Sequence, residues 1–147
     1  MKVLLAIDDS PFSAAATQAV LAFASPQKDT VRVLHVVDAL ADLFPEMTEY
    51  CVEMEHAEDP RLKQAERLVR SVAAPLQAKG LDVTIAVECG EPRSKIIDVA
   101  DAWGADLIVL GSHGRTGFGR FLVGSVSDAV MRHAHCSVEI VRTSHKH

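Results

Sequence analysis

The stretch "GSHGRTGFGRFLVGS" at residues 111–125 holds five glycines, so much of its main chain carries no side chain. Glycine lets main-chain N–H groups come close to a bound anion. Gly124 and Ser125 also come directly before "VSDAVMRHA", a segment that predicts a helix. The unpaired amides and the positive dipole end of such a helix favour phosphate. The stretch is therefore a candidate phosphate-binding loop.

The same residues have a plainer interpretation. Ser125 followed by Asp128 comes close to a capping box, in which case Gly124 and Ser125 only begin a helix and the other glycines only make turns. His113, Arg115 and Arg120 could approach phosphates or simply face solvent. The pattern G-x-x-x-x-G-K-[ST] is absent, and a Rossmann G-x-G-x-x-G would follow the first strand of the chain rather than the fourth. Residue types alone leave both interpretations open.

Five short apolar runs predict the strands that would position this loop. They lie at residues 2–7, 31–37, 81–88, 105–111 and 137–142. Runs that are apolar almost throughout indicate strands buried on both faces. Helical patterns separate them, and this alternation predicts one doubly wound, Rossmann-like α/β domain with a five-stranded, mainly parallel sheet and helices on both faces. The loop then follows the fourth strand, at the carboxyl edge where such sheets bind ligands.

The helical segments carry their own start and stop signals. In residues 10–25, Ser10 is the expected N-cap and Pro11 the first helical residue. The segments 60–80 and 92–104 each end in glycine, as helices often do. In the first helix the apolar residues near one face are Ala15, Ala19, Ala22 and Phe23.

We interpret the whole chain, 1–147, as a single domain. Residues 38–59 are acidic, contain one proline and show no clear period, so they predict a long loop, either a lid or a variable connection. Residues 143–147 form a tail. A net charge of -5 gives no basic surface for nucleic acid. The odd number of widely spaced cysteines, and the absence of a run long enough for a signal peptide or a membrane helix, favour the cytoplasm.

Other groupings of reactive residues are weaker. Asp8 and Asp9 resemble the acidic pair of a response-regulator receiver, but the third strand ends in Glu88 and Cys89 where the phospho-accepting aspartate should stand. A histidine and cysteine cluster at residues 133–136 lies at the end of a helix, without the partner spacing of a metal site. No nucleophile elbow or paired general acid and base is present. We therefore expect no catalytic residue and no metal site built from side chains.

Across its length the sequence resembles the universal stress proteins, and in particular their ATP-binding branch. That branch carries G-x2-G-x9-G-[ST], and Gly111, Gly114, Gly124 and Ser125 occupy each position of it. "VLLAIDDSPFS" and "VLHVVD" look like the family's first two strands. The resemblance implies the adenine nucleotide alpha hydrolase-like form of the fold.

The resemblance also implies which residues hold ATP. Around the adenine and the ribose they are the main chain of Ile7, Asp8, Val36, Leu110 and Gly111. Around the phosphates they are Gly114, Gly124, Ser125, the amide of Val126, and Ser127. Mg²⁺ or Mn²⁺ can accompany the phosphates.

The implied function is ATP binding in a stress response, with the nucleotide held as a structural or signalling ligand and hydrolysed slowly at most. Strand 137–142 is implied to pair with its copy in a homodimer, and neither nucleic acid nor membrane is an expected partner. Two alternatives stay open. One is a nucleotide-independent homodimeric interaction module of the same fold, and the other is a slow ATPase.

Overall fold

The computed structural model describes residues 1–38, 60–113 and 123–143, and their strands form one five-stranded sheet. The strands are β1 (Lys2–Ile7), β2 (Thr30–Asp38), β3 (Asp82–Gly90), β4 (Leu107–Gly111) and β5 (Ser137–Val141). Their order across the sheet is β3-β2-β1-β4-β5, and every neighbouring pair is parallel. The predicted doubly wound α/β fold is confirmed.

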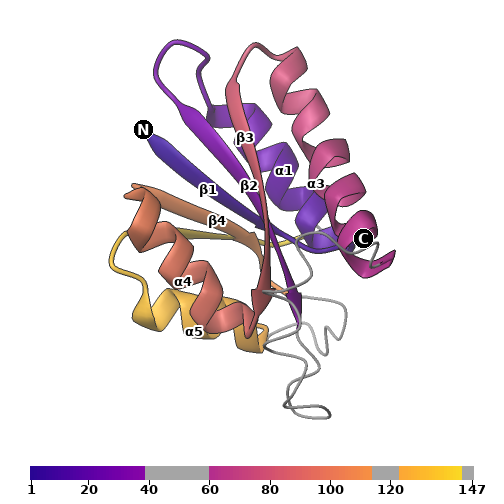
Figure 1. The fold of residues 1–147 in the computed structure, drawn as a ribbon. Helices are drawn as coiled ribbons and strands as arrows, with labels where there is room; N and C mark the ends of the chain where they lie inside the picture. The colour runs from indigo at the N-terminus through magenta and orange to yellow at the C-terminus, as the bar shows by residue number, and fades with distance from the viewer. Residues whose placement is uncertain (39–59, 114–122, 144–147) are drawn as a thin grey trace.

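Helices cover both faces of this sheet (Figure 1). On one face lie α1 (Pro11–Phe23) and α3 (Pro60–Ala78), and on the other lie α4 (Pro92–Trp103) and α5 (Ser125–His133). The chain runs outward from β1 through β2 to β3, then returns to the other side of β1 for β4 and β5. The direction of winding therefore reverses between β1 and β4.

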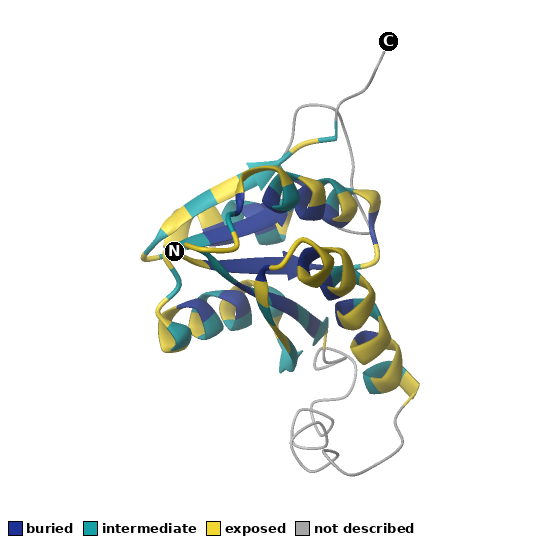
Figure 2. Ribbon diagram, turned by 90° about the horizontal axis from the view of Figure 1, so that it is seen from above, coloured by how far each residue is buried: buried dark blue, intermediate teal, exposed yellow. Residues whose placement is uncertain are grey.

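The central position of β1 in the sheet explains why its sequence is an unbroken apolar run. Val3, Leu5 and Ile7 pack into the core beneath α1 and α3. Leu4 and Ala6 point the other way, into the core beneath α4 and α5. Successive side chains of a strand alternate between faces, and a strand covered on both sides needs apolar residues at every position. Figure 2 shows this buried layer between the two helical layers.

The buried face of α1 differs from the predicted one. Ala15 and Ala19 are half-buried, while Ala22 and Phe23 are exposed. The residues that α1 buries are Ser13, Ala16, Thr17 and Val20. The prediction was wrong because two of these are polar: Ser13 Oγ binds Asp8, and Thr17 Oγ1 donates to the Ser13 carbonyl at 2.9 Å.

The predicted helix ends are confirmed. Ser10 caps α1 by accepting from the Ser13 amide, and Pro11 is the first helical residue. Gly80 and Gly104 follow α3 and α4 with φ of 92° and 72°, a left-handed conformation that glycine adopts without strain.

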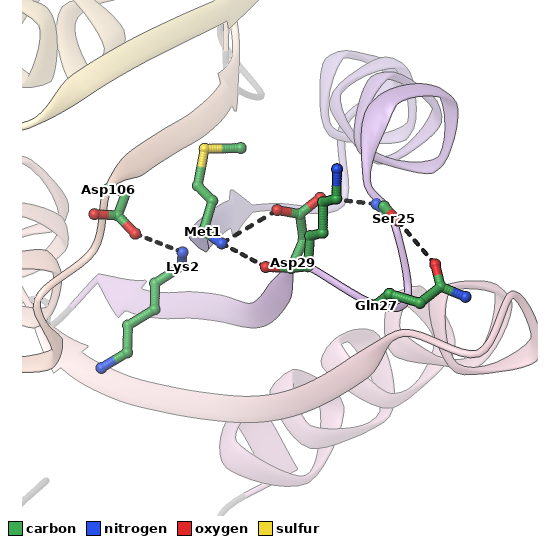
Figure 3. Close-up of polar contacts among 7 residues, drawn as sticks. Met1, Lys2, Ser25, Gln27, Asp29 and Asp106 are labelled. Carbon is green, nitrogen blue, oxygen red and sulfur yellow. Dashed lines mark hydrogen bonds and ion pairs between the residues drawn. The ribbon is translucent and has the colours of Figure 1, made fainter.

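Polar contacts tie the amino-terminal end of β1 to its neighbours (Figure 3). The Met1 ammonium group lies 3.3 Å from Asp29 Oδ1, and the Lys2 amide donates to Asp106 Oδ2 at 2.7 Å. Asp29 Oδ2 accepts from the Ser25 amide at 2.8 Å. The Ser25 hydrogen bond, helped by the Met1 ammonium group, holds the pKa of Asp29 below its usual range.

We expect Asp29→Asn to lower the free energy of unfolding by about 1 kcal/mol at neutral pH, because the ion pair with Met1 is lost and the Ser25 amide then donates to an uncharged acceptor. The pKa of Asp29 is depressed in the folded protein, so its contribution is present above the unfolded pKa and disappears as pH falls through the folded one. Urea unfolding of both proteins at a series of pH values measures the difference. A difference that does not shrink below about pH 4 would contradict this origin.

Two expectations concern residues outside the described part of the chain. Asp38 ends β2, and the rest of the predicted long loop, 39–59, is not described. Of the predicted tail only residue 143 is described. No helix in the described ranges combines the length and the apolarity needed to cross a membrane.

Candidate functional site

The carboxyl ends of β1 and β4 lie side by side at the point where the winding reverses. In doubly wound sheets ligands bind in the crevice outside the strand ends at this switch point. Asp8 follows β1 there, and the segment Gly111 to His113 ends and follows β4. The candidate site is therefore built from the residues that directly follow β1 and β4 and from the helices that come next in the chain, α1 and α5.

A compact set of hydrogen bonds fixes the Asp8 carboxylate. Its Oδ1 accepts from the Ser10 amide and from the Ser13 hydroxyl, each at 2.9 Å. The Ser13 hydroxyl in turn accepts from the Asp8 amide at 2.7 Å. Both bonds to the carboxylate end on Oδ1. Asp8 is only half-buried, so the carboxylate is held in place at the edge of the sheet and stays accessible.

Ser112 joins the end of β4 to the start of α5. Its amide donates to the Val141 carbonyl at 2.9 Å, which continues the β4 to β5 ladder by one residue. Its carbonyl accepts from the Gly124 amide at 2.7 Å and from the Ser127 hydroxyl at 2.9 Å. Ser112 is 2% exposed. Ser112 thus connects the end of β4 to the start of α5 by hydrogen bonds.

Within the described part of the chain, no side chain caps the first turn of α5. Gly124 occupies the N-cap position and offers no side chain, and Ser125 is the first helical residue, with its side chain exposed. The capping-box interpretation was therefore wrong, and Asp128 pairs with Arg132 at 3.0 Å instead. The first amides of a helix have no partner within it. The amides of Ser125, Val126 and Ser127 can accordingly donate hydrogen bonds to an anion.

Two glycines of the predicted motif stand where the chain is crowded. A Cβ at Gly111 would lie 2.5 Å from Phe12 Cβ and 2.8 Å from its carbonyl carbon and oxygen. A Cβ at Gly124 would lie 3.1 Å from the Ser112 oxygen and 3.2 Å from His113 Cα. Bare main chain at these positions lets α1 and α5 approach the end of β4 closely. Gly114, the remaining glycine of the motif, lies outside the described residues.

His113 extends from the end of β4 into the same region. Its Nδ1 lies 3.0 Å from Ser112 Oγ, and its ring packs against the Phe12 ring with 5.0 Å between centroids. Its Nε2 is buried and has no hydrogen-bond partner among the residues that the structure describes. A buried polar atom without a partner is uncommon in a folded protein and costs stability.

The residues expected around the adenine and ribose occupy two layers. Val36 and Leu110 are buried in the core beneath α4 and α5, while the Ile7 side chain faces α1 and α3. Leu110 is 4% exposed, so only its main chain can line a ligand. The Ile7 carbonyl accepts from His35 Nδ1 at 2.8 Å, and this contact makes Nδ1 the protonated nitrogen of His35. These residues meet only along the carboxyl edge of the sheet.

Sequence reasoning missed the residues that support the site. The contact between Asp8 and the Ser10 amide had a readable signal, because an aspartate often accepts from the amide two residues on, but this pattern does not reveal Ser13. Ser112 had no comparable signal, since its partners lie in other elements. The resemblance places Ser127 at the phosphates, and in the structure its hydroxyl donates to the Ser112 carbonyl at 2.9 Å.

In the histidine and cysteine cluster at residues 133–136, His135 contacts α4. His135 Nδ1 lies 2.9 Å from Asp101 Oδ2 on α4. Burial and the nearby Asp101 raise the pKa of the Cys136 thiol. Within residues 1–38, 60–113 and 123–143, no three His, Cys, Asp or Glu side chains gather in a way that could hold a metal ion.

The fold and the site define a doubly wound α/β protein with an uncapped helix start at its switch point. The model of the universal stress protein family matches residues 1–142, and the chain belongs to this family. Universal stress protein YxiE of Bacillus subtilis is 31% identical over 145 residues, which cover 96% of this chain and 98% of that protein.

Solved structures agree with the fold. That of MJ0577, a universal stress protein of Methanocaldococcus jannaschii, matches with a TM-score of 0.84 and 26% identity, over 99% of this chain and 97% of that one. Two more distant members share the fold. One is a universal stress protein in complex with cAMP, at 24% identity, a TM-score of 0.64 and 98% of each chain. The other is an AMP-bound protein from Arabidopsis thaliana, at 15% identity, a TM-score of 0.65 and 98% and 92% of the chains.

Proposed function

We propose that this protein binds ATP at the switch point and holds it as a structural or signalling ligand in a cytoplasmic stress response. The observation that carries the proposal is the uncapped first turn of α5, fixed beside the end of β4 through Ser112. A helix start of this kind attracts phosphate through its amides and its dipole. The intact G-x2-G-x9-G-[ST] motif and the AMP and cAMP complexes of two family members support an adenine nucleotide.

In this proposal the nucleotide lies along the carboxyl edge of the sheet. The adenine rests against Val36 and the Ile7 main chain, and the ribose against Gly111 and the main chain of Leu110. The phosphates lie on Gly114, Gly124 and the amides of Ser125, Val126 and Ser127, and the Ser125 hydroxyl adds a contact. The Ser127 hydroxyl instead keeps the helix start in position.

Asp8 is suited to a ribose hydroxyl. Its Oδ1 is held by Ser10 and Ser13, and the hydrogen bonds among the described residues leave Oδ2 for a ligand. A carboxylate fixed in this way accepts a hydrogen bond without first losing side-chain freedom. We therefore assign Asp8 to recognition of the sugar rather than to catalysis.

Any Mg²⁺ or Mn²⁺ would be bound through the phosphate oxygens, and hydrolysis would be slow. Fast phosphoryl transfer needs groups that stabilise charge and orient the attacking water. The proposal assigns the site residues to binding, so a purified sample should turn over ATP at well below about one per second, near the low end of ordinary enzymes.

We expect Ser125→Ala to weaken ATP binding by about 1.5 kcal/mol, roughly tenfold, because one hydroxyl contact to a charged phosphate is lost. The exposed Ser125 side chain does not cap α5, so the melting temperature should stay unchanged. Titration calorimetry measures the affinity. Ser125→Thr keeps the hydroxyl and serves as the matched control, and equal affinity of Ser125→Ala and Ser125→Thr for ATP would remove this residue from the site.

We also propose a homodimer formed through residues 137–142. β5 is an edge strand, whose outward N–H and C=O groups can pair with a second copy. The Val141 carbonyl accepts from Ser112 and so faces β4. Main-chain groups alternate in direction along a strand, so those of Val138 and Ile140 face outward.

Val138→Pro is expected to convert the dimer to a monomer, because it removes an outward N–H without removing a bond to β4. Sedimentation at micromolar concentration measures the state of both proteins, and circular dichroism checks that the variant is folded. A wild-type monomer, with or without ATP, would contradict the dimer. A dimer that never binds nucleotide would favour the alternative function, a nucleotide-independent interaction module.

A further inference from the structure

We propose that His113 Nε2 donates a hydrogen bond to a phosphoryl oxygen of the ligand, which makes His113 a residue that selects phosphorylated nucleosides over nucleosides. This inference rests on the proposed function and adds to it a side chain outside the glycine motif. Its starting point is the buried Nε2, for which residues 1–38, 60–113 and 123–143 supply no hydrogen-bond partner. A ligand atom at this position would remove an energetic cost that the nucleotide-free protein carries.

The Ser112 hydroxyl can place the proton of the His113 ring on Nε2. Both main-chain groups of Ser112 are already bonded, and its hydroxyl oxygen lies 3.0 Å from His113 Nδ1. When the Ser112 hydroxyl donates to Nδ1, the neutral ring carries its proton on Nε2. Nε2 is then a donor, which is the character that a phosphate oxygen requires.

The ring is also held in one place. It packs on Phe12 at 5.0 Å between centroids, and Phe12 in turn touches Gly111 closely. A donor whose position is fixed by packing loses little entropy when a ligand arrives. His113 therefore meets the requirement of a recognition group, which a mobile surface histidine would not.

Its place relative to α5 points to phosphate as the acceptor. A Cβ on Gly124 would lie 3.2 Å from His113 Cα, so the histidine stems from main chain that touches the N-cap of the helix. A phosphoryl group bound by the first-turn amides of α5 has further oxygens that can accept a hydrogen bond. The imidazole and the helix start would then share one phosphoryl group, and a nucleoside without phosphate would leave Nε2 unpaired.

The test compares AMP with adenosine by titration calorimetry on the wild type and on variants of His113. His113→Phe keeps the aromatic contact with Phe12 but loses the nitrogen. His113→Asn carries an amide that reaches only the position of Nδ1. Both should lose about 10- to 100-fold in affinity for AMP, the effect of a lost hydrogen bond to a charged group, and should keep the adenosine affinity within about twofold. His133→Gln, which changes an exposed histidine of α5, should alter neither affinity.

A second measurement needs no ligand. Because His113→Phe removes the unpaired nitrogen, the nucleotide-free variant should melt at a higher temperature than the wild type, whereas a histidine with only a structural role would leave it less stable. AMP affinity unchanged in both His113 variants, or AMP and adenosine weakened equally, would overturn the inference and leave the proposed function standing. A wild type that binds neither ligand would overturn both.

Discussion

Gly111→Ala should lower the melting temperature by roughly 6–12 °C, corresponding to about 3 kcal/mol of lost stability. The added Cβ would lie 2.5 Å from Phe12 Cβ and 2.8 Å from the Phe12 carbonyl group. Two of these three atoms are main chain, so the clash cannot be relieved by rotating one side chain. The first turn of α1 would have to move away from β4. Thermal unfolding followed by circular dichroism measures the effect.

Ala14→Ser is the matched control for Gly111→Ala, because Ala14 is an exposed residue of α1, the helix that contains Phe12. A surface change of this kind should alter the stability by less than about 0.5 kcal/mol. If Gly111→Ala melts with the wild type, the close approach of α1 to β4 is not a requirement of the fold. Gly111 would then owe its presence to the ligand alone.

Gly124→Val should reduce ATP affinity at least about 100-fold, a loss of roughly 2.7 kcal/mol, while the domain stays folded. The backbone at Gly124 has φ of -62°, which any residue can adopt, so the effect comes from space and not from strain. Its Cβ would already lie 3.1 Å from the Ser112 oxygen. The branched side chain would displace the helix start and the amides that the proposal assigns to the phosphates. Calorimetry with ATP measures the affinity.

Gly124→Ala should have an intermediate effect on ATP affinity, since its single methyl group requires the neighbouring atoms to shift by only a few tenths of an ångström. It should bind ATP more weakly than the wild type and more tightly than Gly124→Val. Gly124→Val that binds ATP as well as the wild type would refute the phosphate assignment. Outright unfolding of Gly124→Val would show instead that the position serves the fold.

The inner strands could be predicted because helices cover both of their faces, whereas the edge strands β3 and β5 contain no buried residue although buried strands were expected there as well. A strand such as β1 must be apolar at every position, and this pattern is visible without knowing its neighbours. The ends of the strands were predicted less accurately. For example, β3 runs from Asp82 to Gly90, whereas the sequence predicted 81–88. Strand ends depend on hydrogen bonds to the next strand, which the local sequence does not contain.

The buried face of α1 could not be predicted from apolarity. Ser13 and Thr17 face the core because their hydroxyls have partners at Asp8 and at the Ser13 carbonyl. A buried polar side chain costs little once it is hydrogen-bonded. The sequence does not reveal those hydrogen-bond partners, so apolarity alone assigned Ala22 and Phe23 to the core, although both are exposed.

The glycine motif located the site but not the reasons for its glycines. The loop was expected after the fourth strand, and β4 does lead into it at the switch point. Gly111, however, is required by contact with Phe12, a residue far away in the sequence. Ser112 owes its importance to partners in β5 and α5. Such contacts between distant segments become visible only when the chain is folded.

The central claim is that the protein holds ATP, and the most direct test is mass spectrometry of what leaves the protein on denaturation. Wild-type protein, purified without added nucleotide and washed extensively, is denatured, and the released small molecules are identified and quantified against protein. We predict ATP, at up to one molecule per chain, from the wild type and none from Gly124→Val. Contradiction would be a wild type that releases no adenine nucleotide and takes up none when ATP is added, or equal release from both proteins.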